Sequence, residues 1–198
     1  MRLILASQSP ARRAMLAAAD VPHEAMAAGV DEEPFKQALR AEGRDARALA
    51  DALAELKAMR LSVRFPDALV LGCDTTVALD DGTMLDKPED RDDAAAQLRL
   101  LSGRRHRLWS AAVICRAGVA EWRHVAVAAL HVRPLSDAFI DAYLDREWPA
   151  IAGCVGGYRL EGPGVQLFAR IEGDHFTILG LPLLALLDHL RQRGTLAS

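Results

Sequence analysis

Residues 2–13 read RLILASQSPARR, and this stretch predicts the fold class. The short apolar run over residues 2–6 has the pattern of a strand buried in a parallel sheet. Ser9 is well placed as a helix N-cap, and Pro10 suits the first helical position. A strand that leads at once into a helix is typical of α/β proteins, so we expect a sheet with helices packed on it.

The rest of the chain continues this alternation of strands and helices, as apolar periodicity indicates. The predicted helices cover about residues 10–19, 45–63, 92–101, 135–147 and 181–193. The predicted strands cover residues 23–27, 68–79, 107–115, 122–132, 167–171 and 176–179, with a hairpin turn at 80–82 and loops at 29–35 and 151–164. No internal repeat or low-complexity linker interrupts the pattern, so we expect one domain over residues 1–198.

Composition and charge exclude several classes of protein. The 198 residues are 51% hydrophobic and 26% charged, which does not suit a disordered chain or a coiled coil. A net charge of −3 gives no general attraction to nucleic acid or to an anionic membrane. Three cysteines without a CxxC pair, no signal peptide and no bilayer-length apolar run together predict a cytoplasmic protein.

The basic residues are divided unevenly between arginine and lysine. Of the 24, only Lys36, Lys57 and Lys87 are lysines. Codon bias in a GC-rich genome explains the excess of arginine. A position that keeps lysine in such a chain can require a compact ammonium group, and these positions are therefore candidates for a site.

The start of the first predicted helix has groups that bind anions. Ser7, Ser9, Arg12 and Arg13 combine hydroxyl and guanidinium groups with the free N–H groups of a helix N-terminus. This combination predicts a phosphate site. An ordinary capped helix with two solvated arginines has the same local pattern, and the pattern alone favours that simpler interpretation.

Acidic residues supply a second candidate site. Asp74 directly follows a short apolar strand, so we expect it at the carboxyl end of that strand, where ligands of open α/β sheets bind. There it can hold a divalent metal or take a proton from water, although Asp also forms turns. A second carboxylate from residues 31–33 would help to hold a metal, although these acids taken alone strongly favour a solvated loop. Lys57 and Lys87 can supply point charges for a triphosphate, or be surface lysines.

Several other chemistries lack their motifs. The six histidines show no HxxxH or HExxH spacing, which argues against a zinc enzyme. The serines lack a GxSxG context, and no GxxxxGK[ST] phosphate loop is present.

In their order along the chain, these segments resemble the family of Maf-like nucleoside triphosphate pyrophosphatases. The resemblance covers nearly the whole chain. The matching segments are LASQSPARRAML (residues 5–16), GVDE (29–32), LAELKA (53–58), LGCDTTV (71–77), LDKP (85–88), LRLLSGRRH (98–106) and GGYRLEGPGVQLFARIEGDHFTILGLPL (156–183). Several gapped motifs in the right order are far more specific than any one of them.

The resemblance implies a fold and a reaction. The fold is an elongated mixed sheet flanked by helices, in one domain of two lobes with a deep cleft, as in inosine triphosphate pyrophosphatases. The reaction is hydrolysis of a nucleoside triphosphate to the monophosphate and diphosphate with Mg²⁺, Mn²⁺ or Co²⁺. The family also clears non-canonical nucleotides and often forms homodimers.

The resemblance implies roles for individual residues. Asp74 is the implied acid–base residue and a metal ligand, and Glu32 is its partner at metal or water. Lys57 and Lys87 match the motifs that contact the triphosphate, so we expect Lys→Arg exchanges there to reduce activity without reducing stability, whereas Lys36 is incidental. The implied phosphate clamp consists of Ser7, Ser9 and Arg12, with Arg13 as a further member.

Three positions tend to separate the branch that acts on dTTP and UTP from the branch that acts on 7-methyl-GTP. Ala11 matches neither branch, Thr75 matches the first, and Glu161 matches the second. A carboxylate at 161 can accept hydrogen bonds from a guanine edge. The mixture predicts a preference that is broad or directed at modified nucleotides, and it does not single out one base.

Two alternatives remain open at this stage. The family's older name, septum formation protein, suggests a nucleotide-binding regulator of cell division in which catalysis is not essential. An inosine triphosphate pyrophosphatase would keep the reaction and change the base, but that family begins with a Gly/Asn-rich segment instead of SPxR. An acid beside two lysines favours the enzyme.

Overall fold

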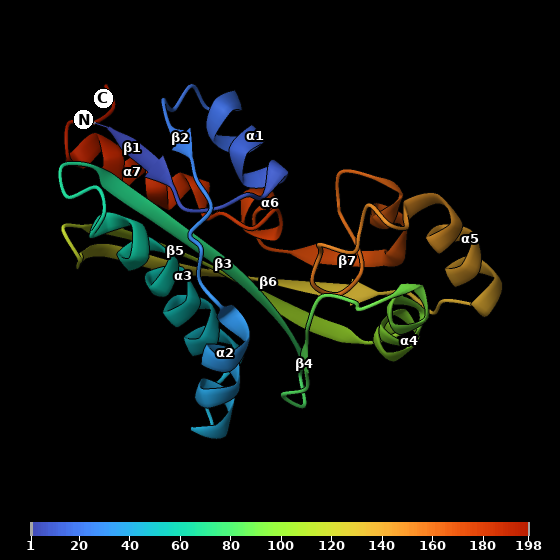
Figure 1. Cartoon of the computed structure of the whole chain (residues 1–198). Helices are drawn as coiled ribbons and strands as arrows, with labels where there is room; N and C mark the ends of the chain where they lie inside the picture. Colours follow the sequence, from blue (N-terminus) through green and yellow to red (C-terminus); the bar gives the residue numbers. More distant parts are fainter. Residues whose placement is uncertain (1, 198) are drawn as a thin grey trace. The chain divides into compact units, whose positions relative to one another are not determined.

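The strands form one mixed seven-stranded sheet with flanking helices in the computed structural model, which describes residues 2–197 (Figure 1). The strand order is β2-β1-β3-β5-β6-β7, and β4 pairs with β3. The strands are β1 (Leu3–Leu5), β2 (Glu24–Ala25), β3 (Leu69–Leu79), β4 (Met84–Leu85), β5 (Arg105–Arg116), β6 (Val119–Val132) and β7 (Phe168–Glu172). The helices are α1 (Pro10–Ala18), α2 (Glu32–Ala41), α3 (Ala46–Ser62), α4 (Arg91–Leu101), α5 (Asp137–Glu147), α6 (His175–Ile178) and α7 (Leu183–Gln192), with a 3-10 helix at Pro163–Leu167.

The sheet confirms the predicted α/β class. Strand β1 pairs in parallel with β2 and β3, whereas β4 runs antiparallel to β3 and β7 antiparallel to β6. Ser9 caps α1 by accepting a hydrogen bond from the Arg12 N–H, and Pro10 begins the helix, as predicted. No helix in the described part of the chain has the length and apolar character that crossing a bilayer requires.

Two predicted elements are wrong. Residues 32–35, expected in a loop, begin helix α2, because Glu32 and Glu33 suit its positive N-terminus and Pro34 is tolerated in a first turn. Residues 176–178, expected in a strand, lie in the short helix α6. A four-residue apolar run does not distinguish a strand from a buried helical turn by its periodicity.

The described residues divide into two units. The first contains the chain up to Thr75, then Trp109–Ala126, then the chain from His175 onward. The second contains Thr76–Leu108 and Val127–Asp174.

In the first unit, the sheet has a hydrophobic core on each face. Because side chains alternate along a strand, Leu3 and Leu5 of β1 pack with α1 and α7, whereas Ile4 packs with α3 on the opposite face. Strand β3 follows the same alternation: Leu69, Leu71 and Cys73 join the first core and Val70 joins the second. Each fully buried leucine contributes about 1.5–3 kcal/mol.

Helix α3 lies unusually close to β3 at Gly72. A Cβ at this position would lie 2.0 Å from the carbonyl oxygen of Ala54 and 2.7 Å from the backbone nitrogen of Ala58. The absent side chain therefore lets the helix backbone touch the strand. Because Lys57 is on the same helix, this close approach sets its distance from Asp74, two residues after Gly72 on β3.

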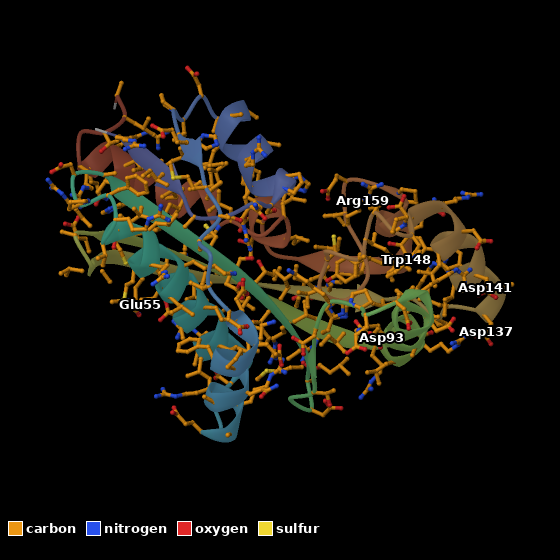
Figure 2. The ribbon with its side chains drawn as sticks, in the orientation of Figure 1. Glu55, Asp93, Asp137, Asp141, Trp148 and Arg159 are labelled. Carbon is orange, nitrogen blue, oxygen red and sulfur yellow. The ribbon has the colours of Figure 1, made fainter. Side chains whose placement is uncertain are left out.

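In the second unit, α4 and α5 pack side by side and are joined by ion pairs. Arg99 of α4 binds Asp137 of α5 at 2.7 Å, and Arg91 lies 3.8 Å from Asp141. Asp137 and Asp141 are labelled in Figure 2. These pairs are solvent-exposed and each contributes little, about 0–1 kcal/mol.

The Gly-rich loop over residues 151–164 of the second unit is held at three points. Arg159, labelled in Figure 2, donates to the buried carboxylate of Glu147 at 2.7 Å. The Tyr143 hydroxyl donates to the Gly157 carbonyl at 3.2 Å. The Tyr158 hydroxyl lies 2.7 Å from Nε2 of His106. Burial lowers the pKa of His106 to about 4. The predicted loop is therefore present up to the 3-10 helix that begins at Pro163, and these three bonds tie it to α5 and β5.

Candidate active site

Asp74 and Thr75 lie in the middle of β3, within one continuous strand. The predicted position of Asp74 at the end of its strand is therefore wrong. Strand β1 ends at Leu5, opposite Leu71, and the last bond along this edge runs from the Ala6 N–H to the Leu71 carbonyl. Asp74 thus lies beyond the carboxyl end of β1, the neighbouring parallel strand. The polar residues Asp74, Thr75 and Thr76 lie between the part of β3 that pairs with β1 and the part that pairs with β4.

The side chain of Asp74 points to the face that α3 covers, and there it meets two charged groups. The Lys57 ammonium donates to Oδ1 of Asp74 at 2.6 Å and lies 3.1 Å from Oε1 of Glu32. The side chains of Lys57 and Asp74 are 11% and 10% exposed, so their pairing is largely shielded from water, whereas Glu32 is half-buried. Three residues that the sequence placed in separate segments are therefore brought together.

Helix geometry explains why Lys57 and Glu32 reach this point. Lys57 lies one turn beyond Ala54 and one residue before Ala58, the two residues against Gly72. Glu32 begins α2, which packs on α3. Of the three acidic residues 31–33, only Glu32 has a described ion pair with Lys57; Asp31 and Glu33 are exposed.

Thr75 points to the opposite face, which α1 and α7 cover, and there it meets Arg12. The Arg12 guanidinium donates from Nη2 to Thr75 Oγ1 at 3.0 Å, from Nη1 to Ser7 Oγ at 3.2 Å, and from Nε to the Gly180 carbonyl at 2.7 Å. Adjacent residues on β3 therefore have different partners: Asp74 binds Lys57 on one face of the sheet, and Thr75 binds Arg12 on the other.

The hydroxyls of Ser7 and Ser9 act mainly as acceptors within this network. Ser7 Oγ accepts from the Ser9 N–H at 3.2 Å as well as from Arg12, and Ser9 Oγ accepts from the Arg12 N–H at 3.4 Å. Their own O–H hydrogens are not used in these bonds. A helix N-terminus with two such hydroxyls and a guanidinium is chemically suited to a phosphate.

The remaining predicted site residues occupy different places. Ala11 is half-buried and Arg13 exposed on α1. Lys87 and Glu161 are exposed in the second unit. Burial raises the pKa of the Cys154 thiol there; the Glu161 carboxylate also raises this pKa, and the Lys87 ammonium lowers it.

Three residues of the network were missed from the sequence. Ser110 is fully buried on β5 and bonds to Thr75 at 3.1 Å. Gly180 has a φ of +98°, which favours glycine, and presents its carbonyl to Arg12. Gly72 admits α3. A serine inside an apolar strand and two isolated glycines gave no local signal, although Gly180 lies in the matched closing segment.

The buried cysteine beside Asp74 does not supply a nucleophile. Burial raises the pKa of Cys73 to about 11, although Arg12 and Lys57 act in the opposite direction. The thiol therefore stays protonated at neutral pH and packs as a small apolar side chain in the core.

The carboxylates of Asp74 and Glu32 are the side chains here that could hold a metal. In residues 2–197, no three His, Cys, Asp or Glu side chains gather as a metal site of protein ligands alone would need. Magnesium usually takes only one or two carboxylates and completes its shell with water and substrate phosphate. Two carboxylates that converge on one ammonium fit that requirement.

Comparison with known proteins relates the chain to one family. A family model described as Maf-like protein matches residues 2–193. A nucleoside triphosphate pyrophosphatase of Sphingopyxis alaskensis is 54% identical over 194 residues, covering 98% of each chain. A 7-methyl-GTP pyrophosphatase of Rhizobium meliloti is 51% identical over 195 residues, covering 98% of this chain and 97% of that protein. The crystal structure of a nucleoside-triphosphatase, dITP/XTP pyrophosphatase, from Mycobacterium abscessus aligns with a TM-score of 0.48 at 15% identity over 98% of this chain and 96% of that chain.

Proposed function

The chain belongs to the Maf-like protein family and is a nucleoside triphosphate pyrophosphatase, and we propose that Asp74, Glu32 and Lys57 carry its chemistry. The observation that supports these roles is the convergence of two carboxylates on the Lys57 ammonium at 2.6 and 3.1 Å. The reaction we propose is hydrolysis to the nucleoside monophosphate and diphosphate.

In the proposed reaction, Asp74 acts as the general base. Lys57 binds its Oδ1, which leaves Oδ2 as the oxygen that takes a proton from the attacking water. The water oxygen bonds to the α-phosphorus, the bond from that phosphorus to the bridging oxygen breaks, and diphosphate leaves. Phosphoryl transfer depends on positioning and charge neutralisation more than on covalent chemistry, and a pre-aligned carboxylate supplies the positioning.

Lys57 has two roles in this scheme. An ammonium has three N–H groups; one is donated to Asp74, and the ammonium also forms an ion pair with Glu32 at 3.1 Å. A remaining N–H group can bind a phosphate oxygen and offset the charge that develops on it. With the substrate bound, the same lysine links the base to the phosphate chain.

The proposed divalent cation would be held by Asp74 and Glu32 together with substrate oxygens. When bound, Mg²⁺, Mn²⁺ or Co²⁺ would neutralise charge on the phosphates. Ser7, Ser9 and Arg12 are the proposed phosphate clamp, and Lys87 is a further proposed contact with the triphosphate.

A nucleotide panel tests the proposed reaction. Canonical and modified nucleoside triphosphates are each incubated with the purified chain and Mg²⁺, Mn²⁺ or Co²⁺, and monophosphate and diphosphate are quantified. We expect stoichiometric release of both products with at least one metal. Failure to turn over any nucleotide, or release of single phosphate groups instead, would contradict the proposal.

Exchange of lysine for arginine should have different consequences at the two proposed contacts. Lys57 is nearly buried, so Lys57→Arg should lower kcat/KM by about tenfold to a hundredfold, because a planar fork does not reproduce a point charge between two carboxylates. Because the side chain is nearly buried, we also expect a lower melting temperature through overpacking, in contrast to the unchanged stability expected from the sequence. Lys87 is exposed, so Lys87→Arg should lower activity alone. Steady-state kinetics and thermal melting measure both, with Lys36→Arg as the control; full activity of Lys57→Arg would remove the requirement for an ammonium.

We further propose a broad or modified-nucleotide preference, with Ala11 and Glu161 as the residues that face the base. Relatives of about 50% identity include one named for 7-methyl-GTP, which makes a guanine-type base a candidate. Glu161→Gln should reduce the ratio of kcat/KM for 7-methyl-GTP over UTP by about tenfold, because a charged acceptor for the guanine edge is lost. Competition assays with both nucleotides measure the ratio, and an unchanged ratio would exclude Glu161 from base selection.

Other proposed properties rest on the sequence pattern or on the resemblance. These are a single two-lobed domain with a cleft, a cytoplasmic location, the clearing of non-canonical nucleotides and a homodimeric state. Light scattering after gel filtration measures the last of them. A role in septum formation without essential catalysis is the alternative, and it predicts that a catalytically inactive variant still changes cell division.

A further inference from the structure

We infer that Ser110 and Thr75 form a one-way hydrogen-bond chain that orients the Arg12 guanidinium toward phosphate, so that Thr75 is a positioning residue of the clamp. The inference rests on the proposed function, because Arg12 is taken to bind the triphosphate. It assigns a role to Ser110 and changes the expected role of Thr75, which the resemblance associates with choice of base.

The direction of the chain follows from counting protons. The Thr177 carbonyl can only accept, so Ser110 donates its single O–H hydrogen to it, at 2.7 Å. Ser110 Oγ must then accept in its 3.1 Å contact with Thr75, which donates its own hydrogen. Thr75 Oγ1 has no second hydrogen, and it accepts from Nη2 of Arg12 at 3.0 Å. Each hydroxyl therefore has one possible orientation.

The chain fixes one of three anchor points on Arg12. The Gly180 carbonyl holds Nε at 2.7 Å and Ser7 Oγ holds Nη1 at 3.2 Å. A guanidinium has five N–H groups, and these contacts use one on each nitrogen. The two N–H groups that remain belong to the two terminal nitrogens, an arrangement suited to two oxygens of one phosphate.

Burial explains why such a chain can hold a long side chain in place. Ser110 and Thr177 are fully buried, and the Thr177 and Gly180 carbonyls both belong to the tightly turned segment at and after α6. A Cβ at Gly180 would lie 3.1 Å from Thr75 Oγ1 and 3.3 Å from Arg12 Nε, so this segment packs directly against the chain. A buried acceptor that loses its donor costs the full free energy of its desolvation. This cost favours the arrangement in which every acceptor of the Ser110–Thr75–Arg12 hydrogen bonds keeps its donor.

A ligand without a base separates positioning from base reading. Binding of inorganic triphosphate is measured by calorimetry for the wild-type chain, Thr75→Val, Thr75→Ser and Ser110→Ala. We expect about tenfold weaker binding for Thr75→Val and Ser110→Ala, since each releases one anchor of a charged donor, and near wild-type binding for Thr75→Ser, which keeps the hydroxyl. The double variant Thr75→Val with Ser110→Ala should be no weaker than either single variant, because the chain is already broken.

Kinetic and stability measurements exclude a merely structural effect. The Thr75→Val variant should raise KM for nucleotides more than it lowers kcat, and the pH profile of kcat, which reports the Asp74 face, should not move. Thr83→Val, an exposed threonine in the β3–β4 turn, is the matched control and should bind triphosphate as the wild type does. Melting curves establish that each variant is folded at the assay temperature.

The outcomes are distinguishable from failure of the proposed function. If no nucleotide is hydrolysed, the proposed function fails, but triphosphate binding still tests the hydrogen-bond chain from Arg12 to Ser110. If Thr75→Val binds triphosphate normally and only reorders the preferred bases, Thr75 reads the base and the inference is overturned. Normal binding by Ser110→Ala, or no triphosphate binding by the wild type, would overturn it as well.

Discussion

Replacing Asp74 by Asn should reduce turnover of every accepted nucleotide by about 10²–10⁴-fold, the range for loss of a general base. The amide keeps the shape of the side chain but cannot take the proton of water. Lys57 retains Glu32 as a partner at 3.1 Å, so its ammonium is not left alone in a nearly buried position. We therefore expect a folded protein that still binds inorganic triphosphate, whose proposed clamp lies on the opposite face of β3.

The matched control is Asp137→Asn, at a residue labelled in Figure 2. The exchange removes an exposed carboxylate that pairs with Arg99. It should leave turnover unchanged. Product formation under substrate saturation measures the rate, and circular dichroism measures the fold. Activity within tenfold of the wild type in Asp74→Asn would exclude Asp74 as the base, whereas loss of triphosphate binding would show that the exchange damages more than proton transfer.

The parts of this site that could be predicted are those with a local physical signature. Ser9 and Pro10 have the chemistry of a helix start whatever surrounds them, and the structure confirms both. Glu32, Lys57 and Asp74 were identified through ordered motifs, and the structure brings them within hydrogen-bonding or ion-pair distance. Single lysines and acids in separate segments carry no geometric information of their own, so it was the combination that identified them.

The parts that could not be predicted depend on contacts between distant segments. Ser110 has the pattern of a polar residue inside an apolar strand, and its role arises from a carbonyl 67 residues away. The strand containing Asp74 continues past the end of β1, so its local pattern did not show that the pairing with β1 ends before Asp74. Helix α2 begins with three residues, Glu32 to Pro34, whose polarity is equally typical of a loop, and its packing on α3 decides between them.

Replacing Gly72 by Ala should destabilise the chain by about 2–4 kcal/mol, the upper range for overpacking. The new Cβ would lie 2.0 Å from the Ala54 carbonyl oxygen and 2.9 Å from the Ala58 Cβ, and two of its three nearest neighbours are backbone atoms that cannot rotate away. Helix α3 must therefore move off the sheet. Its movement carries Lys57 away from Asp74, so activity should fall by about a hundredfold even in the fraction that remains folded, because a shift of about 1 Å has that effect on an aligned site.

Gly153→Ala is the matched control, because a Cβ there would meet nothing within 4 Å and its φ is not in the left-handed region. Chemical denaturation measures the free energy of unfolding, and kinetics are recorded at a temperature where both variants are folded. A Gly72→Ala variant as stable and active as Gly153→Ala would mean that α3 does not press on β3 as the structure shows. Loss of stability with normal specific activity would separate the two consequences: the close approach would then stabilise the fold, and some other contact would set the position of Lys57. The joint loss is expected because Ala54, Lys57 and Ala58 lie on one turn of α3, and that turn cannot leave the strand without taking the ammonium from its carboxylates.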